Sequence, residues 1–122
     1  GKLIKKIILN KKRLNYSAYP ILLKKTKIFL NTLSPLGLVS PRYFENMGCR
    51  SLVFCEESSL YKNIFDNGTY VTFKNDISDF YEKICYYLEN SKERDSITNK
   101  AFRHVTSKHT WDERINTLLK KI

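Results

Sequence analysis

The sequence predicts an α/β fold: a parallel sheet of about three to four strands with helices on both faces and a helical C-terminal part. Three observations predict it. Short apolar runs of strand length alternate with segments of helical period up to Phe73. A strand, loop, helix, strand unit in this part is punctuated by Pro35 and Gly37. Beyond Phe73 the apolar residues recur only at helical spacing.

The chain is expected to form a single domain over 1–122, and its first part combines strands with a helix. Lys6–Asn10 is a short apolar run typical of a strand, although residues 1–14 also fit a linker or a displaced strand. A helix is expected over 17–25, because apolar residues are followed by lysines at its end. A buried strand should follow directly over 27–31.

A central short helix is expected over residues 41–47. Ser40 is a preferred N-cap residue, and Pro41 suits the first helical position because its missing N–H would have no acceptor there. Val39 and Phe44 stand at the spacing of a hydrophobic staple. These signals place a helix start at the carboxyl end of the sheet, where open α/β folds bind ligands.

Gly48 is expected to end this helix by adopting a positive φ, and a strand should follow over 51–55. Residues 56–59 then lie at the carboxyl end of that strand. We expect them to face the same crevice as Ser40 and Glu45, because parallel strands end at the same edge of a sheet.

The rest of the chain is expected to be mainly helical. Beyond a short helix over 60–65 and a strand over 70–73, helices are predicted over 77–89, with Asp76 as N-cap, and over 92–106. Thr110 and Glu113 form a capping box for a last helix. Apolar stripes at helical spacing usually face a core, so we expect the following residues to point inward: Ile77, Phe80, Tyr81, Ile84, Tyr87, Leu88, Ile97, Ala101, Val105, Trp111, Ile115, Leu118 and Leu119.

Composition narrows the class of protein. The chain has 122 residues, enough for one core, and 42% of them are hydrophobic, which is typical of a globular protein. No apolar run approaches the roughly 20 residues that span a bilayer. The chain begins at Gly1 without a signal-like segment, which favours a fragment or a processed chain in the cytoplasm over an exported precursor.

The net charge of +10 indicates attraction to anions without choosing among them. The preferred interpretation of this charge is a solvated face that reflects compositional bias. A patch that contacts an anionic surface, such as the inner face of a membrane, is the alternative. Nucleic acid is an unlikely partner, because no nucleic-acid-binding motif is visible.

Cysteine and histidine spacing gives no metal signature. The three cysteines are odd in number and include no C-x-x-C pair, so we expect reduced, buried thiols in a cytosolic protein. His104 and His109 are five residues apart, which does not place two ligands on one helix face, and both are interpreted as surface residues. We therefore expect no metal and no cofactor.

The segment Phe44-Glu45-Asn46-Met47-Gly48-Cys49 resembles GT-B glycosyltransferases, in which a glutamate opens an E-x-M-x-C-G pattern before a core strand. Together with Ser40 to Glu45 and Phe65-Asp66-Asn67-Gly68-Thr69-Tyr70-Val71-Thr72-Phe73 it is closer still to the CgeB-like branch, related to the glycosyl transferases of group 1. The resemblance covers about residues 15–122 and corresponds to the last part of the C-terminal, donor-binding, Rossmann-like domain.

The resemblance implies a nucleotide sugar as substrate and an upstream N-terminal lobe as partner. Glu45 would bind the ribose hydroxyls, and Arg42 could add a charged fork. The loop and the helix start would hold the diphosphate with backbone amides, above all those of Arg42 and Tyr43. The implied donor-nucleotide residues are Val39, Ser40, Pro41, Arg42, Tyr43 and Glu45.

This sequence departs from the family pattern at three places. A second acid stands eight residues before the glutamate in many members, and here that position is Gly37, or Ser34 in an alignment on Gly37-Leu38-Val39. The basic pair for the donor phosphates would precede residue 1, and Arg50 replaces the usual glycine. The catalytic residues are therefore unknown, and we expect an isolated chain without a full active site. The alternative is a non-catalytic basic α/β module that binds a nucleotide, an anionic surface or a protein partner.

Overall fold

A computed structural model describes residues 15–122 and contains a three-stranded parallel sheet in the order β1-β2-β3. The strands are β1 (Ile28–Asn31), β2 (Leu52–Glu56) and β3 (Val71–Phe73). Phe29 pairs with Val53, and Cys55 pairs with Thr72. The predicted α/β class and its partial Rossmann-like sheet are confirmed; the predicted strand Lys6–Asn10 lies outside the described residues.

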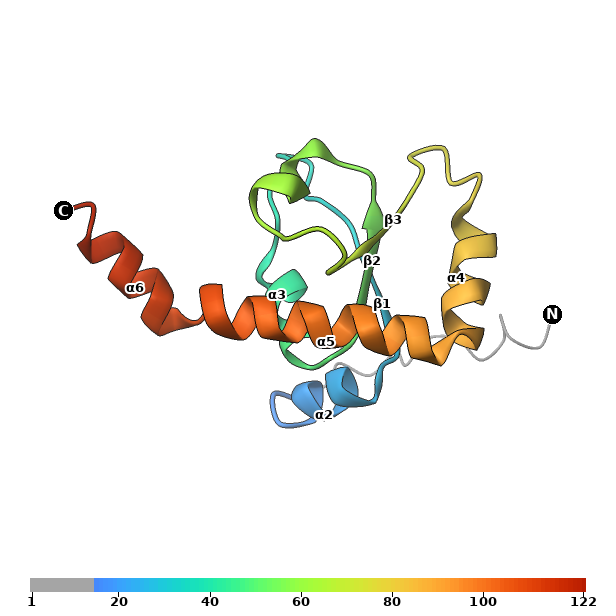
Figure 1. Ribbon diagram of the computed structural model, residues 1–122, viewed down its shortest axis with the longest axis horizontal. Coiled ribbons are helices and arrows are strands. Elements are labelled where there is room, and N and C mark those ends of the chain that lie inside the picture. The colour runs from blue at the N-terminus through green and yellow to red at the C-terminus, as the bar shows by residue number, and fades with distance from the viewer. Residues whose placement is uncertain (1–14) are drawn as a thin grey trace.

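The helices lie within a few residues of their predicted bounds (Figure 1). Residues 15–122 contain five α-helices and one short 3₁₀ helix, η1: α2 (Ala18–Lys25), α3 (Pro41–Gly48), η1 (Ser59–Asn63), α4 (Phe80–Glu89), α5 (Ser91–Lys108) and α6 (Trp111–Leu119). Helix α3 follows β1 and precedes β2, as the strand, loop, helix, strand interpretation requires.

Strand β2 separates two apolar cores, because its side chains alternate between the two faces of the sheet. Val53 and Cys55 pack with residues of α3, η1 and α5. Leu52 and Phe54 pack with β3 and α4 on the other face. A strand with helices on both faces is buried throughout, which explains the uninterrupted apolar run in its sequence.

Helix α5 contributes to both cores. Ile97, near its start, packs with α4 and the second core, whereas Ala101 and Val105 belong to the first. Asn90 lies at the junction with α4, as the C-cap of one helix and the N-cap of the next. Figure 1 shows α5 running from α4 across to the side of α3.

Helix α3 ends close to the expected position, but the expectation that Gly48 ends it with a positive φ is wrong. Gly48 lies inside the helix, and the residue with positive φ is Arg50, at 58°. The guanidinium of Arg50 lies 4.3 Å from the ring centroid of Phe102 and donates to Asn99 at 3.2 Å. These two contacts with α5 hold a side chain in a backbone region that only glycine adopts without cost.

Helix α4 begins later than predicted. The Asp76 side chain accepts from the backbone N–H of Ser78 at 3.0 Å and so closes a turn instead of capping the helix. Ile77 has a φ of 57° and is exposed, so it is not part of the inward stripe. Asp79 takes the N-cap position, and the helix starts at Phe80.

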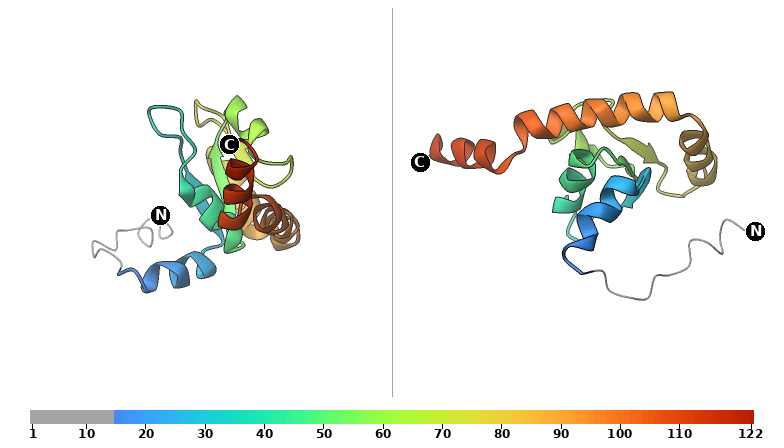
Figure 2. Two further views of the ribbon diagram at one scale, coloured as in Figure 1. Left: turned by 90° about the vertical axis from the view of Figure 1, so that its left-hand side faces the viewer. Right: turned by 90° about the horizontal axis from the view of Figure 1, so that it is seen from below.

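Helix α6 begins as predicted but does not bury its apolar face. The Thr110 hydroxyl accepts from the backbone N–H of Glu113 at 3.3 Å, which confirms the N-cap. Trp111 is 85% exposed and Leu118 is 60% exposed, so the expected inward face points to solvent. Figure 2 shows α6 extending past the sheet and α3, with no other described element alongside its end.

Candidate functional site

The loop from β1 to α3 is closed by its own hydrogen bonds. The Ser34 carbonyl accepts from the backbone N–H of Gly37 at 2.8 Å, and the Ser34 hydroxyl accepts from that of Leu38 at 3.1 Å. Gly37 has a φ of 69°, which explains glycine at this position. The loop therefore delivers Val39 and Ser40 to the start of α3 in a defined direction.

Helix α3 starts at the carboxyl edge of the sheet, as expected. Ser40 has extended backbone angles at the N-cap and Pro41 occupies the first helical position, although the Ser40 side chain makes no capping hydrogen bond. The Arg42 amide lies in the first turn, where amides have no acceptor within the helix. Such amides attract anions through the partial positive charge of the helix end.

Two neighbouring hollows meet at Pro41 and Glu45. One, of about 420 Å³, is formed mainly by apolar side chains and is lined by Val39, Pro41, Phe44, Glu45, His109, Trp111 and Arg114. The other, of about 400 Å³, is lined by Tyr19, Ser40, Pro41, Arg42 and Glu45. Five of the six predicted donor-site residues thus line these two hollows, all but Tyr43.

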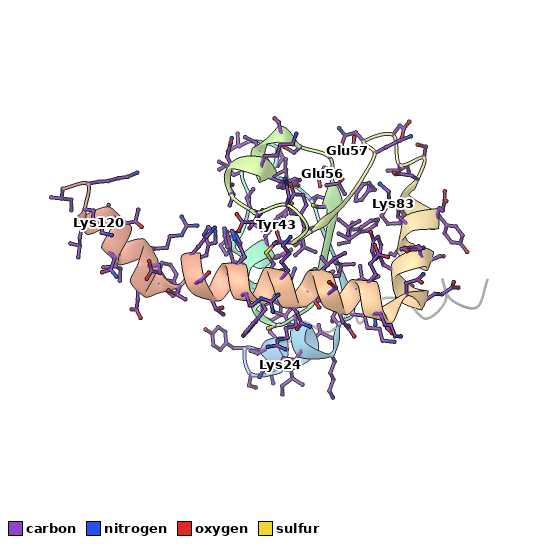
Figure 3. All side chains as sticks on the ribbon, in the orientation of Figure 1. Lys24, Tyr43, Glu56, Glu57, Lys83 and Lys120 are labelled. Atoms are coloured by element: carbon purple, nitrogen blue, oxygen red, sulfur yellow. The ribbon has the colours of Figure 1, made fainter. Side chains whose placement is uncertain are left out.

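Tyr43 lies in the interior of the molecule (Figure 3). Its hydroxyl is 3.0 Å from that of Tyr61, and burial raises the pKa of Tyr43 to about 12. Its backbone N–H donates to the Ser40 carbonyl at 3.3 Å. Tyr43 therefore positions α3 against the first core, and Arg42, which is exposed, is the first-turn residue that lines the hollow beside Ser40.

Glu45 is exposed and is oriented by a partner that the sequence did not reveal. The Tyr19 hydroxyl, from α2, donates to Glu45 Oε2 at 3.0 Å. Burial raises the pKa of Tyr19, and the bond to Glu45 raises it further, so the phenol stays protonated as the donor. The sequence predicts only that Tyr19 lies in the helix over 17–25, because no sequence pattern links residues 26 apart.

Residues 56–59 do not share this site. The Glu56 side chain accepts from the backbone N–H of Leu33 and so anchors the loop. Glu57, Ser58 and Ser59 line a separate hollow of about 430 Å³, which has no lining residue in common with any of the hollows that Glu45 lines. In Figure 3, Glu56 and Glu57 lie at the upper end of β2. The expectation of one shared crevice is wrong, because residues 57–59 line a hollow together with Tyr70 and Thr72, next to β3, and not with α3.

His104 and His109 are not the surface residues that the sequence suggested. His104 is buried and His109 is half-buried, and their Nε2 atoms are 3.1 Å apart. His104 lies three residues after Ala101, on the buried side of α5, and this spacing was the signal that sequence reasoning missed.

The partners of His109 fix its tautomer. An Arg114 N–H donates to His109 Nδ1 at 2.9 Å, so this nitrogen carries no proton. His109 Nε2–H then points to His104 Nε2 and the Ile64 carbonyl, at 3.1 and 3.2 Å. His104 Nδ1 lies 3.0 Å from Asp66 Oδ2, and its Nε2 lies 3.2 Å from the Ile64 carbonyl. The result is a connected series of contacts from Arg114 to Asp66 that ties the start of α6 to the body of the protein.

The cysteines and the acidic residues offer no further chemistry in the described part of the chain. All three cysteines are free; Cys55 is buried, and Cys49 and Cys85 are half-buried. Burial raises the pKa of the Cys55 thiol to about 12, so it is not a nucleophile near neutral pH. Within residues 15–122, no three His, Cys, Asp or Glu side chains gather as a metal site would require. In the same range, no helix is both long and apolar enough to cross a membrane.

Comparison with known proteins assigns the family. A search of curated proteins finds no match to the chain. A family model described as glycosyl transferase-like matches residues 5–120, nearly the whole sequence. This agrees with the resemblance carried by the segment around Glu45 and with the parallel α/β sheet. The chain therefore belongs to the glycosyl transferase-like family.

Proposed function

We propose that this chain is the nucleotide-sugar-binding part of a GT-B glycosyltransferase, which transfers a sugar from a nucleotide donor to an acceptor. The observation that carries the proposal is the position of Glu45. Its exposed carboxylate lies between two hollows, one turn into the helix whose N-terminus faces one of them. Membership of the glycosyl transferase-like family supports the same function.

The chemistry of a nucleotide donor matches these groups. Vicinal ribose hydroxyls can donate hydrogen bonds to a carboxylate that is fixed in position. Tyr19 holds Glu45 in place through Oε2 and leaves Oε1 available to the ligand. A diphosphate needs N–H donors and positive charge. The Arg42 amide and guanidinium, beside Ser40 at the start of α3, supply both. Binding requires no metal in this scheme.

The chain supplies only part of an active site. The loop over 32–40 contains no Asp or Glu, so the second acid of many family members is absent. Acceptor binding and the remaining catalytic groups belong to the upstream N-terminal lobe of a longer parent protein. We therefore propose that the isolated chain is inactive as a transferase, and that the parent works in the cytoplasm or on the inner face of the membrane.

The missing acid also favours a second candidate function, a non-catalytic basic module. In that case the same surface binds a nucleotide, an anionic surface or a protein partner without sugar transfer. Salt distinguishes charge-driven binding from ribose recognition. Attraction through the +10 charge weakens steeply as salt rises, whereas hydrogen bonds to Glu45 are less sensitive.

Calorimetric titration with UDP, GDP and their sugar conjugates, at low and moderate salt, tests the proposal. We expect saturable binding of one nucleotide class, weakened about tenfold or more by Glu45→Ala, since hydrogen bonds to a charged group are lost. Glu57→Ala is the matched control, because it removes an exposed carboxylate from the separate hollow. Equal losses in both variants, or no nucleotide binding by a folded chain, would contradict the proposal.

A further inference from the structure

The hollow beside Trp111 contains a large aromatic side chain that nothing in the described structure covers. Trp111 is the first residue of α6 and is 85% exposed, yet it lines a hollow of about 420 Å³ with Phe44 and Val39. An apolar hollow with few polar groups is the usual form of a small-molecule site. An open indole ring at its edge offers a flat surface for stacking.

The start of α6, and with it the backbone of Trp111, is held in place by neighbouring residues. Thr110 caps the helix, and the His109 backbone N–H donates to the Val105 carbonyl at 2.9 Å, so α5 and α6 meet in a defined turn. Arg114 bonds His109 and lies 5.5 Å from the ring centroid of Phe44. These contacts connect α6 to α3 and fix one wall of the hollow against the other.

The covalent order of a nucleotide determines which part reaches this hollow. The ribose stands between the base and the phosphates, and in the proposed function it is bound at Glu45. The hollow on the Arg42 side provides the helix N-terminus and an exposed guanidinium, which suit phosphate. Two other hollows border Glu45 and could receive the base: the Trp111 hollow, and one of about 390 Å³ beside α2 that Tyr19 also lines. Tyr19 already bonds Glu45 on the α2 side, so the Trp111 hollow is the one left open to the base. The donor sugar lies beyond the diphosphate and cannot reach it.

The lining of the Trp111 hollow suits a neutral ring. Glu45 and one arginine line each of the two hollows, so these charges do not decide between them. The helix N-terminus, which suits phosphate, lies on the Arg42 side. In the Trp111 hollow, the Arg114 guanidinium already contacts His109 Nδ1 and the Phe44 ring, and burial lowers the pKa of His109, so its imidazole is neutral near pH 7. A flat, uncharged heteroaromatic ring needs no amide donors and gains stacking contacts with the indole.

We propose that the Trp111 hollow is the nucleobase subsite, in which the base stacks on the Trp111 indole while the ribose is bound at Glu45. This inference rests on the proposed function, since it takes the ribose position from it. It adds α6, which sequence reasoning treated only as core, to the ligand-binding surface.

Trp111 is the single tryptophan of the chain and therefore a direct reporter. We expect UDP or GDP to change its fluorescence saturably, whereas inorganic pyrophosphate and ribose 5-phosphate, which lack a base, do not. By calorimetry, Trp111→Ala should weaken binding of the nucleoside diphosphate about tenfold, the usual loss of one base stack. Ribose 5-phosphate affinity should stay unchanged, and Trp111→Phe should keep most of the nucleotide affinity.

Leu118→Ala is the matched control, because Leu118 is exposed on the same helix but does not line the hollow. Nucleotide binding that depends on Glu45 but is unaffected by Trp111→Ala would overturn this inference and leave the proposed function standing. Complete absence of nucleotide binding would overturn both. Equal losses for the nucleotide and for ribose 5-phosphate would show that Trp111 supports the site structurally and does not contact the base.

Discussion

Strand β2 and helix α6 are both rich in apolar residues, yet one is the most buried part of the molecule and the other is among the most exposed. Leu52 and Phe54 of β2 are at most 1% exposed, whereas Trp111 and Leu118 of α6 are 85% and 60% exposed. The sheet offers β2 a cover on each face, while α6 contacts the body only near its start. An apolar stripe therefore indicates which face seeks a partner, but not whether the chain itself supplies it.

The largest loss of stability should come from a substitution in β2, the buried element of the two. Phe54 packs against Phe73 and Phe80, with ring centroids 5.0 and 5.4 Å away. Phe54→Ala should lower the free energy of unfolding by about 3–5 kcal/mol, because it leaves a cavity between sheet and α4. Chemical denaturation measures this loss, and a change below about 1 kcal/mol would show that this core is not formed in solution.

The contacts of His109 and Asp66, which join the start of α6 to the body, should make the stability of the protein depend on pH. Burial, then the charges of Arg114, His104 and Lys108, lower the pKa of His109 below its ordinary value of 6.5, and the Ile64 carbonyl partly offsets this. Lys108 and His104 also lower the pKa of Asp66. Both groups bind protons more strongly in the unfolded chain, so stability should fall as pH falls.

The histidine effect should begin near pH 6.5, where unfolded histidine titrates, and the Asp66 effect should follow below about pH 4. Thermal midpoints measured from pH 7.5 downward test this order. His109→Gln should flatten the upper part of the profile and leave the acidic part in place. A profile that rises as the pH is lowered through 6.5 would contradict the arrangement.

Gly48→Ala should change the free energy of unfolding less than Phe54→Ala does, and in the opposite direction. Gly48 lies within α3 without a positive φ, and a Cβ there would meet no atom within 4 Å. Alanine should therefore stabilise the protein by about 0.5–1 kcal/mol through its helix propensity. Gly37→Ala is the contrasting variant, since a φ of 69° makes alanine strained there. Destabilisation by Gly48→Ala would restore the original prediction for the helix end.

The smallest change in the free energy of unfolding is expected from a substitution in α6. Leu118→Ala should change the free energy of unfolding by no more than about 0.5 kcal/mol, because the side chain is exposed. Denaturation at two protein concentrations provides the check. A loss of 2 kcal/mol or more would show that the apolar face of α6 is covered in solution, and a dependence on concentration would identify a second copy as the cover.

Local signals in the sequence predicted the elements well, since they depend on nearby residues. Ser40 and Pro41 marked the start of α3, and Thr110 that of α6. The apolar run over 51–55 correctly indicated the strand that forms as β2. The donor-site residues could be found only through the resemblance at Glu45, and their role in binding stays a prediction.

Contacts between distant segments could not be predicted from the sequence. Tyr19 meets Glu45, and Arg50 adopts a strained backbone because Phe102 lies on a helix about fifty residues later. His104 and His109 pair because the chain turns between α5 and α6. In each case a tertiary partner overrides the local preference, and no spacing rule encodes that partner.

The position of α5 has a consequence for how the molecule opens. A three-stranded sheet with separate covers could lose one face while keeping the other, but Ile97 and Ala101 anchor a single continuous helix to both. Neither face can be exposed without disturbing α5. The amides of the sheet and of α5 should therefore exchange with solvent deuterium as one slow unit, while those at the end of α6 exchange through fraying.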